Sequence, residues 1–286
     1  MIEKRLFFQQ SICPFLTGMM VSFILFLGGY NDMAHGAPGI VNIDKEDLVW
    51  IGDAIFQKEC GGKKEHLLAW NKGEDFPSLG IGHFIWYPKG MEGPFEESFP
   101  AFLNFAKQRG VQLPVFIDSM KNMDCPWTSR REFLRARNTD AMKSLYSFLM
   151  NTHYEQTLFI VTRLKIAIPK IMEAAPHDKK EHIRSQLVRV ADSSRKLYAL
   201  IDYVNFKGEG IKSTERYNNQ GWGLLQVLEE MKGTKPGTEA IHEFIRAAET
   251  VLARRVDNAP AGRNEHRWLP GWKNRINDYK FLVTLT

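Results

Sequence analysis

The stretch that decides the fold reads DKEDLVWIGDAIFQKECGG, residues 44–62. Apolar residues recur in it at helical spacing, at Leu48, Ile51 and Ile55. The two closing glycines are typical of a helix end, because glycine adopts the left-handed conformation that ends a helix. The sequence therefore predicts a helix that starts at Asp44, with Glu59 in its last turn on the same apolar stripe.

Glu59 has the position expected of a proton donor. Its stripe directs the carboxyl group toward apolar surroundings, and the negative end of the helix dipole disfavours a carboxylate there. Both effects favour the neutral form of the group. A glutamic acid that stays protonated near neutral pH suits general-acid cleavage of a glycosidic bond. The alternative is a boundary glutamate that turns outward into solvent.

A second stretch, SLGIGHFIW, predicts a strand over Leu79–Trp86 between two prolines. Strand alternation places Ser78, Gly80 and Gly82 on one face. Two glycines leave bare backbone, which a sugar ring or a helix can approach closely. We expect Ser78 to hold a water or the substrate beside the scissile bond. His83, on the opposite face, is either a substrate-binding residue or a core imidazole.

The two stretches together resemble the active-site signature of the phage-type lysozymes, glycoside hydrolase family 24. In that signature a catalytic glutamate precedes the sequence Ser/Thr-x-Gly-Ile-Gly-His. The resemblance implies that Glu59 is the catalytic acid and that Ser78 replaces the family's active-site threonine. It also implies that residues 80–83 form the glycine hairpin. The family's second carboxylate, an aspartate between the motifs, has three counterparts at altered spacing: Glu65, Glu74 and Asp75.

A weaker match follows at residues 199–214, ALIDYVNFKGEGIKST. It is similar to the family's Ala-Leu-x-x-Phe-x-Phe-Asn-x-Gly…Ser-Thr stretch, which forms the far wall of the cleft. Asn205 corresponds after a shift of one residue. Because residues 88–196 exceed what phage lysozymes carry between these motifs, the resemblance implies a helical insertion there.

Candidate sugar-binding residues gather in YNNQGWGLLQ, residues 217–226. Aromatic faces and amide hydrogen bonds suit the binding of sugars. We therefore expect a wall of the substrate site made by Tyr217, Asn219, Gln220 and Trp222, with Trp70 as a similar candidate beside Glu59. The Gly-Leu-Leu-Gln portion also looks like the Gly-Leu-Met-Gln of lytic transglycosylases. A helix start with Trp222 anchored in the core is the alternative.

The N-terminal segment has the features of an export signal. Lys4 and Arg5 precede an apolar run over residues 12–29, and small residues follow at Ala34 and Gly36. We predict a signal peptide over residues 1–36, or a retained membrane anchor, and a periplasmic or secreted chain. Membrane contact is expected only if the segment is retained. Removal of Cys13 leaves an even number of cysteines, which favours a Cys60–Cys125 disulfide in an oxidising compartment.

Composition and charge exclude several classes. The chain has 286 residues, 44% of them hydrophobic and 25% charged, which suits a globular enzyme. The net charge of +5 suits an anionic envelope polymer. We expect no nucleic acid as partner, because no basic–aromatic stripe accompanies the charge. No GxSxG, Walker, dinucleotide or HExxH motif is present and the histidines are scattered, so we expect neither metal nor cofactor.

These observations predict a mainly α, α+β lysozyme-like fold with a small β-hairpin after the first catalytic helix. We expect a single domain over residues 37–286, with long helical stretches at 140–168 and 179–206 and a helix capped by Thr238. The predicted function is a peptidoglycan hydrolase that cleaves β-1,4 glycosidic bonds of murein or of a related amino-sugar polymer. A lytic transglycosylase, a chitosanase or chitinase, and a non-catalytic wall-binding protein are also compatible with the sequence.

Overall fold

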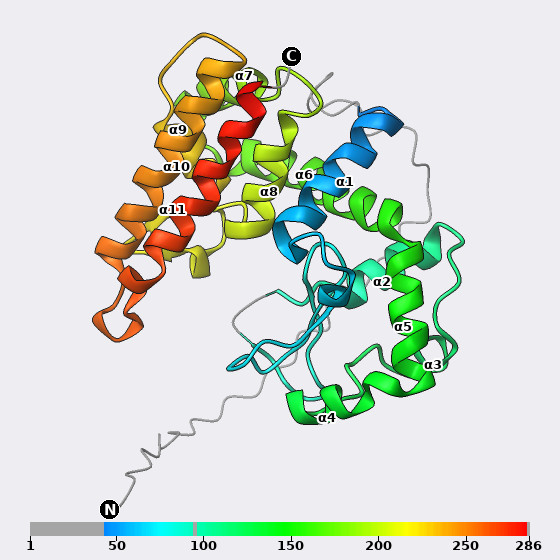
Figure 1. The fold of residues 1–286 in the computed structure, drawn as a ribbon. Helices are drawn as coiled ribbons and strands as arrows, with labels where there is room; N and C mark the ends of the chain where they lie inside the picture. The colour runs from blue at the N-terminus through cyan, green and yellow to red at the C-terminus, as the bar shows by residue number, and fades with distance from the viewer. Residues whose placement is uncertain (1–42, 94–95, 285–286) are drawn as a thin grey trace, which may run out of the picture. The chain divides into compact units, whose positions relative to one another are not determined.

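A computed structural model describes residues 43–93 and 96–284, which are mainly helical (Figure 1). All of them lie in the second of the chain's two units, residues 37–286. The signal segment predicted for residues 1–36, with Cys13, lies outside the described residues. None of the described helices is both long and apolar enough to cross a bilayer.

Helix α1 (Lys45–Cys60) confirms the helix predicted from the first stretch. The carboxylate of Asp44 accepts a hydrogen bond of 2.8 Å from the amide of Asp47, which caps the first turn. Gly61 ends the helix in the left-handed conformation, with a φ of 59°. The local signals therefore fix both ends of this helix and place Glu59 in its last turn.

The second stretch forms the small β-hairpin expected after the first helix, with its turn at residues 80–83, and not one continuous strand over Leu79–Trp86. Strands β1 (Leu68–Ala69), β2 (Ser78–Leu79) and β3 (Phe84–Ile85) make a small antiparallel sheet in that order. Residues 80–83 are the turn between β2 and β3. Gly80, with a φ of 69°, reverses the chain there, which a residue with a side chain does only under strain.

Residues 88–196 are largely helical, as predicted. The helices are α2 (Phe99–Gln108), α3 (Val115–Asp118), α4 (Arg130–Arg135), α5 (Asp140–Asn151), α6 (His153–Ala174) and α7 (Lys180–Val190). Helix α6 packs against both α1 and α8, so this segment contributes a central helix of the fold and not only a peripheral addition. The stretch predicted over 140–168 divides between α5 and α6, because Thr152 leaves the helical conformation.

The C-terminal part contains α8 (Leu197–Lys207), α9 (Leu224–Glu230), α10 (Thr238–Asn258) and α11 (Leu269–Asn277), with a hairpin of β4 (Arg216–Tyr217) and β5 (Gln220–Gly221). The stretch predicted over 179–206 is interrupted at residues 191–196, between α7 and α8. The cap predicted at Thr238 is wrong, because Gly237 precedes the first helical residue and no side chain caps α10. Short 3-10 helices complete the order: η1 (Lys64–Leu67), η2 (Ala136–Asn138), η3 (His177–Lys179), η4 (Ser213–Glu215), η5 (Ala261–Arg263), η6 (Glu265–Arg267) and η7 (Asp278–Thr284).

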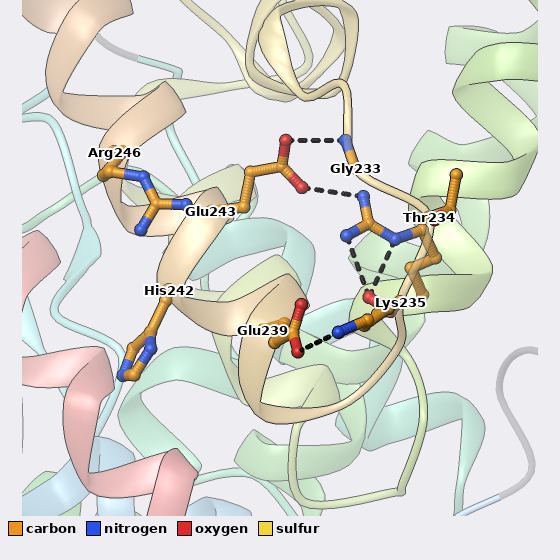
Figure 2. Close-up of a pocket in the computed structure, with 8 residues that line it drawn as sticks. Gly233, Thr234, Lys235, Glu239, His242, Glu243 and Arg246 are labelled. Carbon is orange, nitrogen blue, oxygen red and sulfur yellow. Dashed lines mark hydrogen bonds and ion pairs between the residues drawn. The ribbon is translucent and has the colours of Figure 1, made fainter.

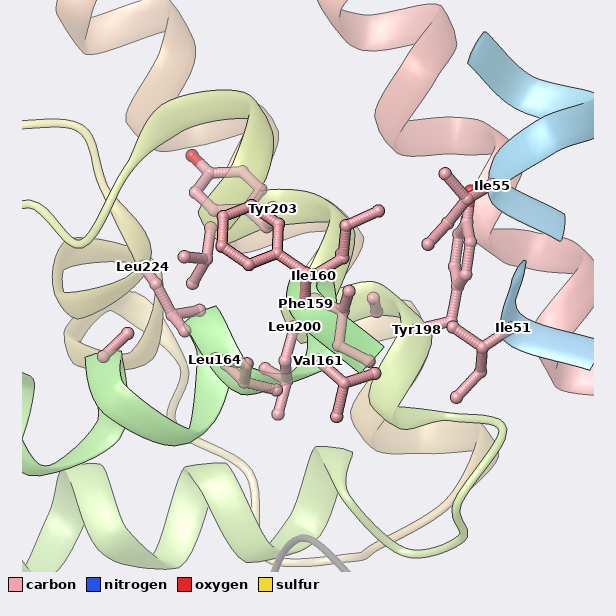
Figure 3. Close-up of a cluster of buried hydrophobic side chains, with 14 of the residues drawn as sticks. Ile51, Ile55, Phe159, Ile160, Val161, Leu164, Tyr198, Leu200, Tyr203 and Leu224 are labelled. Atoms are coloured by element: carbon pink, nitrogen blue, oxygen red, sulfur yellow. The ribbon is translucent and has the colours of Figure 1, made fainter. Parts of the chain in front are cut away.

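Helix α8 lies at the centre of the hydrophobic core. Its residues 197–204 are all buried. Figure 3 shows Leu200 and Tyr203 of α8 among side chains of α6, while Tyr198 lies beside Ile51 and Ile55 of α1. Full burial of one such side chain contributes about 1.5–3 kcal/mol to folding. This core fixes the relative positions of α1 and α8, and both helices contribute a carboxylate to the candidate site.

Candidate active site

The carboxylate of Glu59 forms an ion pair with Arg275 of α11. Its Oε1 accepts a hydrogen bond from Nη2 of Arg275, and the side chain of Glu59 is 19% exposed. Arg275 also donates to both carboxylate oxygens of Asp202 on α8, over 2.6 Å from Nη2 and 3.0 Å from Nε. One guanidinium therefore joins two carboxylates that come from different helices.

The Asp202 carboxylate is held from a second side by Tyr279. The Tyr279 hydroxyl donates to Oδ2 of Asp202 over 2.6 Å, and both residues are buried. Burial lowers the pKa of Arg275, but the charges of Asp202 and Glu59 outweigh it and hold that pKa well above its usual range. Burial, reinforced by Asp202, raises the pKa of Tyr279 well above its usual range. The guanidinium is thus permanently charged, and Asp202 fixes its orientation.

The surroundings of Glu59 differ from the apolar setting that its helical stripe predicts. Arg275 contacts one carboxylate oxygen, and Nδ1 of His83 lies 3.6 Å from the other, Oε2. The stripe describes only the face that α1 buries, whereas Arg275 comes from a segment 216 residues further along the chain. The expectation of an apolar pocket around Glu59 is therefore wrong, and the carboxylate instead faces a cation and an imidazole.

His83 lies between Glu59 and Cys60. Its Nε2 is 3.8 Å from the Sγ of Cys60, and the side chain is 26% exposed. Burial lowers the pKa of His83, and the charge of Arg275 lowers it further, while Glu59 and Glu74 act in the opposite direction. The imidazole is therefore predominantly neutral near neutral pH. His83 is therefore not a fully buried core imidazole but lies beside the candidate acid, and its role in binding substrate stays a prediction.

The predicted Cys60–Cys125 disulfide is wrong, because both cysteines are free and buried. The Sγ of Cys60 lies 3.8 Å from the carbonyl oxygen of Gly80, and the Sγ of Cys125 lies 3.5 Å from that of Trp127. Burial raises the pKa of each thiol to about 12. Both thiols therefore stay protonated and are poor nucleophiles.

The bare backbone of the glycine turn is covered by protein. A Cβ atom on Gly80 would lie 2.2 Å from Oε1 of Gln156 on α6, and one on Gly82 would lie 2.7 Å from the ring of Phe84. The same Oε1 accepts a hydrogen bond of 2.8 Å from the amide of Ile81. Helix α6 therefore lies against this backbone at Gly80 and Ile81.

Ser78 and the candidate second carboxylates have different positions. Ser78 is 6% exposed in β2, and no contact joins it to Glu59 among the residues described. Its burial does not fit a residue that holds a water at an open cleft. Glu74 is partly buried, accepts a hydrogen bond of 3.1 Å from Asn71 and acts electrostatically on His83. Asp75 is exposed and is not among the groups that shift the pKa of His83 most. Glu74 is therefore the better candidate for the second carboxylate.

Two tryptophans predicted to bind sugar are mainly structural. Trp70 is 5% exposed, packs edge-on against Phe133 and donates its indole hydrogen to the carbonyl oxygen of Glu74. Trp222 is 6% exposed, and its carbonyl oxygen accepts a hydrogen bond from the hydroxyl of Tyr203. For Trp222 a core anchor at a helix start describes the structure better than a sugar-binding wall.

The remaining predicted sugar-binding residues lie on α8 and the β4–β5 hairpin. Asn205 is partly buried and donates to the carbonyl oxygen of Ile201. The hydroxyl of Tyr217 donates to Glu265, while Asn219 and Gln220 are exposed at the hairpin turn. No contact joins them to Glu59 in the described part of the chain, so their role in binding sugar stays a prediction.

A series of contacts between cationic and aromatic side chains begins at Arg275. The guanidinium carbon of Arg275 lies 4.5 Å from the centre of the Phe206 ring. Lys207 lies over Phe206 and Trp272, and Arg255 lies over Trp272, Trp222 and Tyr217. We call these six residues the cation–aromatic wall: Phe206, Lys207, Tyr217, Trp222, Arg255 and Trp272. It adjoins the ion pair of Glu59 and contains four residues that were not predicted as site residues: Phe206, Lys207, Arg255 and Trp272.

A separate polar pocket of about 350 Å³ lies between α7, α10 and the loop that joins α9 to α10 (Figure 2). Two ion pairs lie in it, Arg189 with Glu243 and Lys235 with Glu239. Nη1 of Arg189 lies 2.8 Å from Glu243, and Glu243 also accepts from the amide of Gly233. None of the predicted site residues lines this pocket. These contacts hold the loop against α10 and indicate a structural role.

Within residues 43–93 and 96–284 no group of three or more histidine, cysteine, aspartate or glutamate side chains is arranged to hold a metal ion. Comparison with protein-family models, with curated proteins and with solved structures finds no match to this chain. The residues around Glu59 are therefore the features of this chain that indicate a function.

Proposed function

We propose that this protein has a lysozyme-like fold and cleaves the β-1,4 glycosidic bonds of murein outside the cytoplasm, with Glu59 as the proton donor. The observation that carries the proposal is the position of the Glu59 carboxylate. It lies at the end of α1, 3.6 Å from His83 of the glycine turn, and is held by Arg275. The two stretches that resemble the phage-lysozyme signature thus meet at one carboxylate.

The contacts around Glu59 leave one of its two carboxylate oxygens facing His83. Arg275 contacts Oε1, and Asp202 fixes Arg275 by two hydrogen bonds. Nδ1 of His83 lies 3.6 Å from the other oxygen, Oε2. As the proton donor, Glu59 would protonate the leaving oxygen, and Arg275 would stabilise the resulting carboxylate.

A lytic transglycosylase is the second candidate, and a specific observation favours it. Asp202 is bound by Arg275 and Tyr279, and Glu74 reaches the site only through its effect on His83. Glu59 is thus the carboxylate that remains for chemistry. In that reaction Glu59 acts first as acid and then as base, and a hydroxyl of the muramic acid attacks instead of water.

A chitosanase, a chitinase and a non-catalytic wall-binding protein have less support. A chitosanase binds a polycation, which the net charge of +5 on the chain disfavours. A chitinase binds an uncharged polymer, so the positive net charge of the chain contributes nothing to its binding. A non-catalytic wall-binding protein needs no carboxylate held between a guanidinium and an imidazole.

The test is murein digestion by wild type and by Glu59→Gln. We expect Glu59→Gln to lose activity by about a hundredfold or more, because glutamine cannot transfer the proton. Glu181→Gln is the matched control, since the side chain of Glu181 is 90% exposed on α7. Mass spectrometry of the products separates the two reactions: reducing ends mean hydrolysis, and anhydromuramic ends mean transglycosylation. Murein binding without cleavage, unchanged in Glu59→Gln, would overturn the proposal.

A further inference from the structure

Trp268 is an exposed tryptophan at the start of α11. It is 42% exposed, and it is the one large hydrophobic residue so exposed from α8 to α11, residues 197–277, all of which the structure describes. Tryptophan is the residue that most often anchors a binding partner, because its large ring supplies much contact area. An external group can reach this ring without any movement of the protein.

Trp268 shares one face of α11 with the candidate active site. Trp268, Trp272 and Arg275 follow one another at spacings of four and three residues, which place them on one side of a helix. The amide of Trp272 donates to the carbonyl oxygen of Trp268 over 3.0 Å, so the helical spacing includes Trp268. Arg275 holds Glu59 at one end of this face. Trp268 lies about 10 Å further along the helix axis, a length comparable to one β-1,4-linked disaccharide.

Aromatic rings cover the distance between the two ends of this face. The ring centres of Trp268 and Trp272 are 6.2 Å apart, and their planes are inclined by 38°. Lys207 lies over both Trp272 and Phe206, and the Phe206 ring centre is 4.5 Å from the guanidinium carbon of Arg275. Trp272 and Phe206 are only partly buried. A series of rings with solvent-exposed surface therefore leads from Arg275 to Trp268.

Arg267 supplies hydrogen-bond donors beside the exposed ring. Its guanidinium carbon lies 4.6 Å from the centre of the Trp268 ring. Its side chain forms no hydrogen bond or ion pair with any residue that the structure describes. Because a guanidinium carries five donors and no acceptor, Arg267 can bind the oxygen atoms of a molecule that lies against Trp268.

A sugar ring fits these features better than a membrane does. In a β-1,4-linked amino sugar the substituents lie at the edge of the ring, so its faces present C–H groups. These groups suit the negatively charged face of an aromatic ring, and the polar edge suits a neighbouring guanidinium. A membrane contact needs a larger apolar surface, and residues 197–277 contain no second exposed large hydrophobic residue.

We propose that Trp268 stacks against a sugar ring of the glycan strand, about one disaccharide away from the bond beside Glu59. The inference rests on the proposed function for its substrate and adds a binding position on α11 remote from the reacting bond. Arg267 donates to the hydroxyl or acetamido oxygens of the same ring. Because this contact is the same in substrate and transition state, it lowers KM and leaves kcat unchanged.

The test is calorimetric binding of a peptide-free murein hexasaccharide to the full chain carrying Glu59→Gln, which prevents cleavage. We expect Trp268→Leu to weaken binding about tenfold, a usual effect of losing an aromatic anchor. Trp268→Tyr should keep most of the affinity. Leucine and tyrosine both keep an apolar contact with Trp272, but only tyrosine keeps an aromatic face. Phe281→Leu is the matched control, since Phe281 is 38% exposed and packs against Trp50, and it should bind as the parent does.

Two further measurements apply even if Trp268→Leu does not fold. The hexasaccharide should change the tryptophan emission of the parent, and at equal occupancy Trp268→Tyr should show a smaller change because it lacks the stacked indole. In chains that retain Glu59, a substitution at Trp268 should act on cleavage of murein oligomers through KM, with kcat unchanged.

Equally tight binding of the hexasaccharide by the parent and Trp268→Leu would overturn the inference, as would an emission change of full size in Trp268→Tyr. Trp268-dependent binding to vesicles of anionic phospholipid, without binding of the hexasaccharide, would overturn it in favour of a membrane contact. Murein cleavage by the wild type with hexasaccharide binding independent of Trp268 removes this inference alone. Binding that depends on Trp268, without cleavage by the wild type, removes the proposed function alone.

Discussion

Asp202 holds Arg275 by two hydrogen bonds, of 2.6 and 3.0 Å, that use both of its carboxylate oxygens. The same guanidinium holds Glu59, so the charge of Asp202 determines how strongly Arg275 attracts Glu59. The sequence around Glu59 reveals neither Arg275 nor Asp202 as its neighbour. One feature of the sequence does point to Asp202. It is a single carboxylate in the apolar run Ala199–Val204, which predicts a buried, paired group.

We predict that Asp202→Asn lowers both the rate of murein cleavage and the stability of the fold. Without the charge of Asp202, Arg275 loses the partner that fixes its orientation and holds Glu59 less firmly in place. The free energy of unfolding should fall by about 3 kcal/mol, as is typical when a buried ion pair loses one member. Murein-cleavage rates and urea denaturation measure the two effects. An unchanged rate would contradict the role given to Asp202.

We predict that His83 makes the fold less stable in mild acid. Its pKa is lowered by burial, so the folded protein binds the proton less readily than the unfolded chain. Stability should therefore be independent of His83 well above its usual pKa of 6.5 and should decline as the pH falls through that value toward the lower pKa of the folded state. In His83→Asn, which tolerates the φ of 46°, this part of the decline should disappear. Denaturation at a series of pH values compares the two proteins.

We predict that Gly80→Ala destabilises the protein more than a change of backbone conformation alone explains. Gly90→Ala is the matched control, because Gly90 has a φ of 75° with open space around its Cβ position. The control should lose about 1–2 kcal/mol from left-handed strain. Gly80→Ala should lose about 2 kcal/mol more, because its Cβ would meet Gln156. Equal losses in thermal unfolding would show that Gln156 gives way.

We predict that Cys60 and Cys125 resist alkylation in the folded protein. Both thiols are buried, and their pKa values of about 12 leave almost no thiolate. Iodoacetamide labelling mapped by mass spectrometry should modify both cysteines only after denaturation, with or without reductant. Labelling that requires a reductant as well would mean that the disulfide predicted from the sequence exists after all.

The sequence predicts those features that depend on neighbouring residues. The ends of α1 are set by Asp44 and Gly61, whose capping roles are local. The buried stripe of α10 follows its helical period in the same way, and Ile241, Phe244 and Val251 are buried as that period predicts. The mainly helical class with a small β element after α1 follows from the same local patterns.

The sequence does not predict contacts between distant segments. An even cysteine count and an oxidising compartment favour a disulfide, but only the tertiary fold decides whether two sulfur atoms meet. The alternation of side chains in residues 79–86 predicts a strand that continues through Gly80. It does not reveal that the backbone reverses at this glycine. Arg275 gains its significance from Glu59, which lies 216 residues away on another helix.

The distance along the chain between Glu59 and Arg275 has a consequence for biosynthesis. The two are 216 residues apart, so a ribosome must pass residue 275 before the pair can form. A nascent or prematurely terminated polypeptide therefore carries Glu59 without the guanidinium that positions it. Since such long-range contacts form late in folding, the proposed activity would stay off until synthesis of that region is complete.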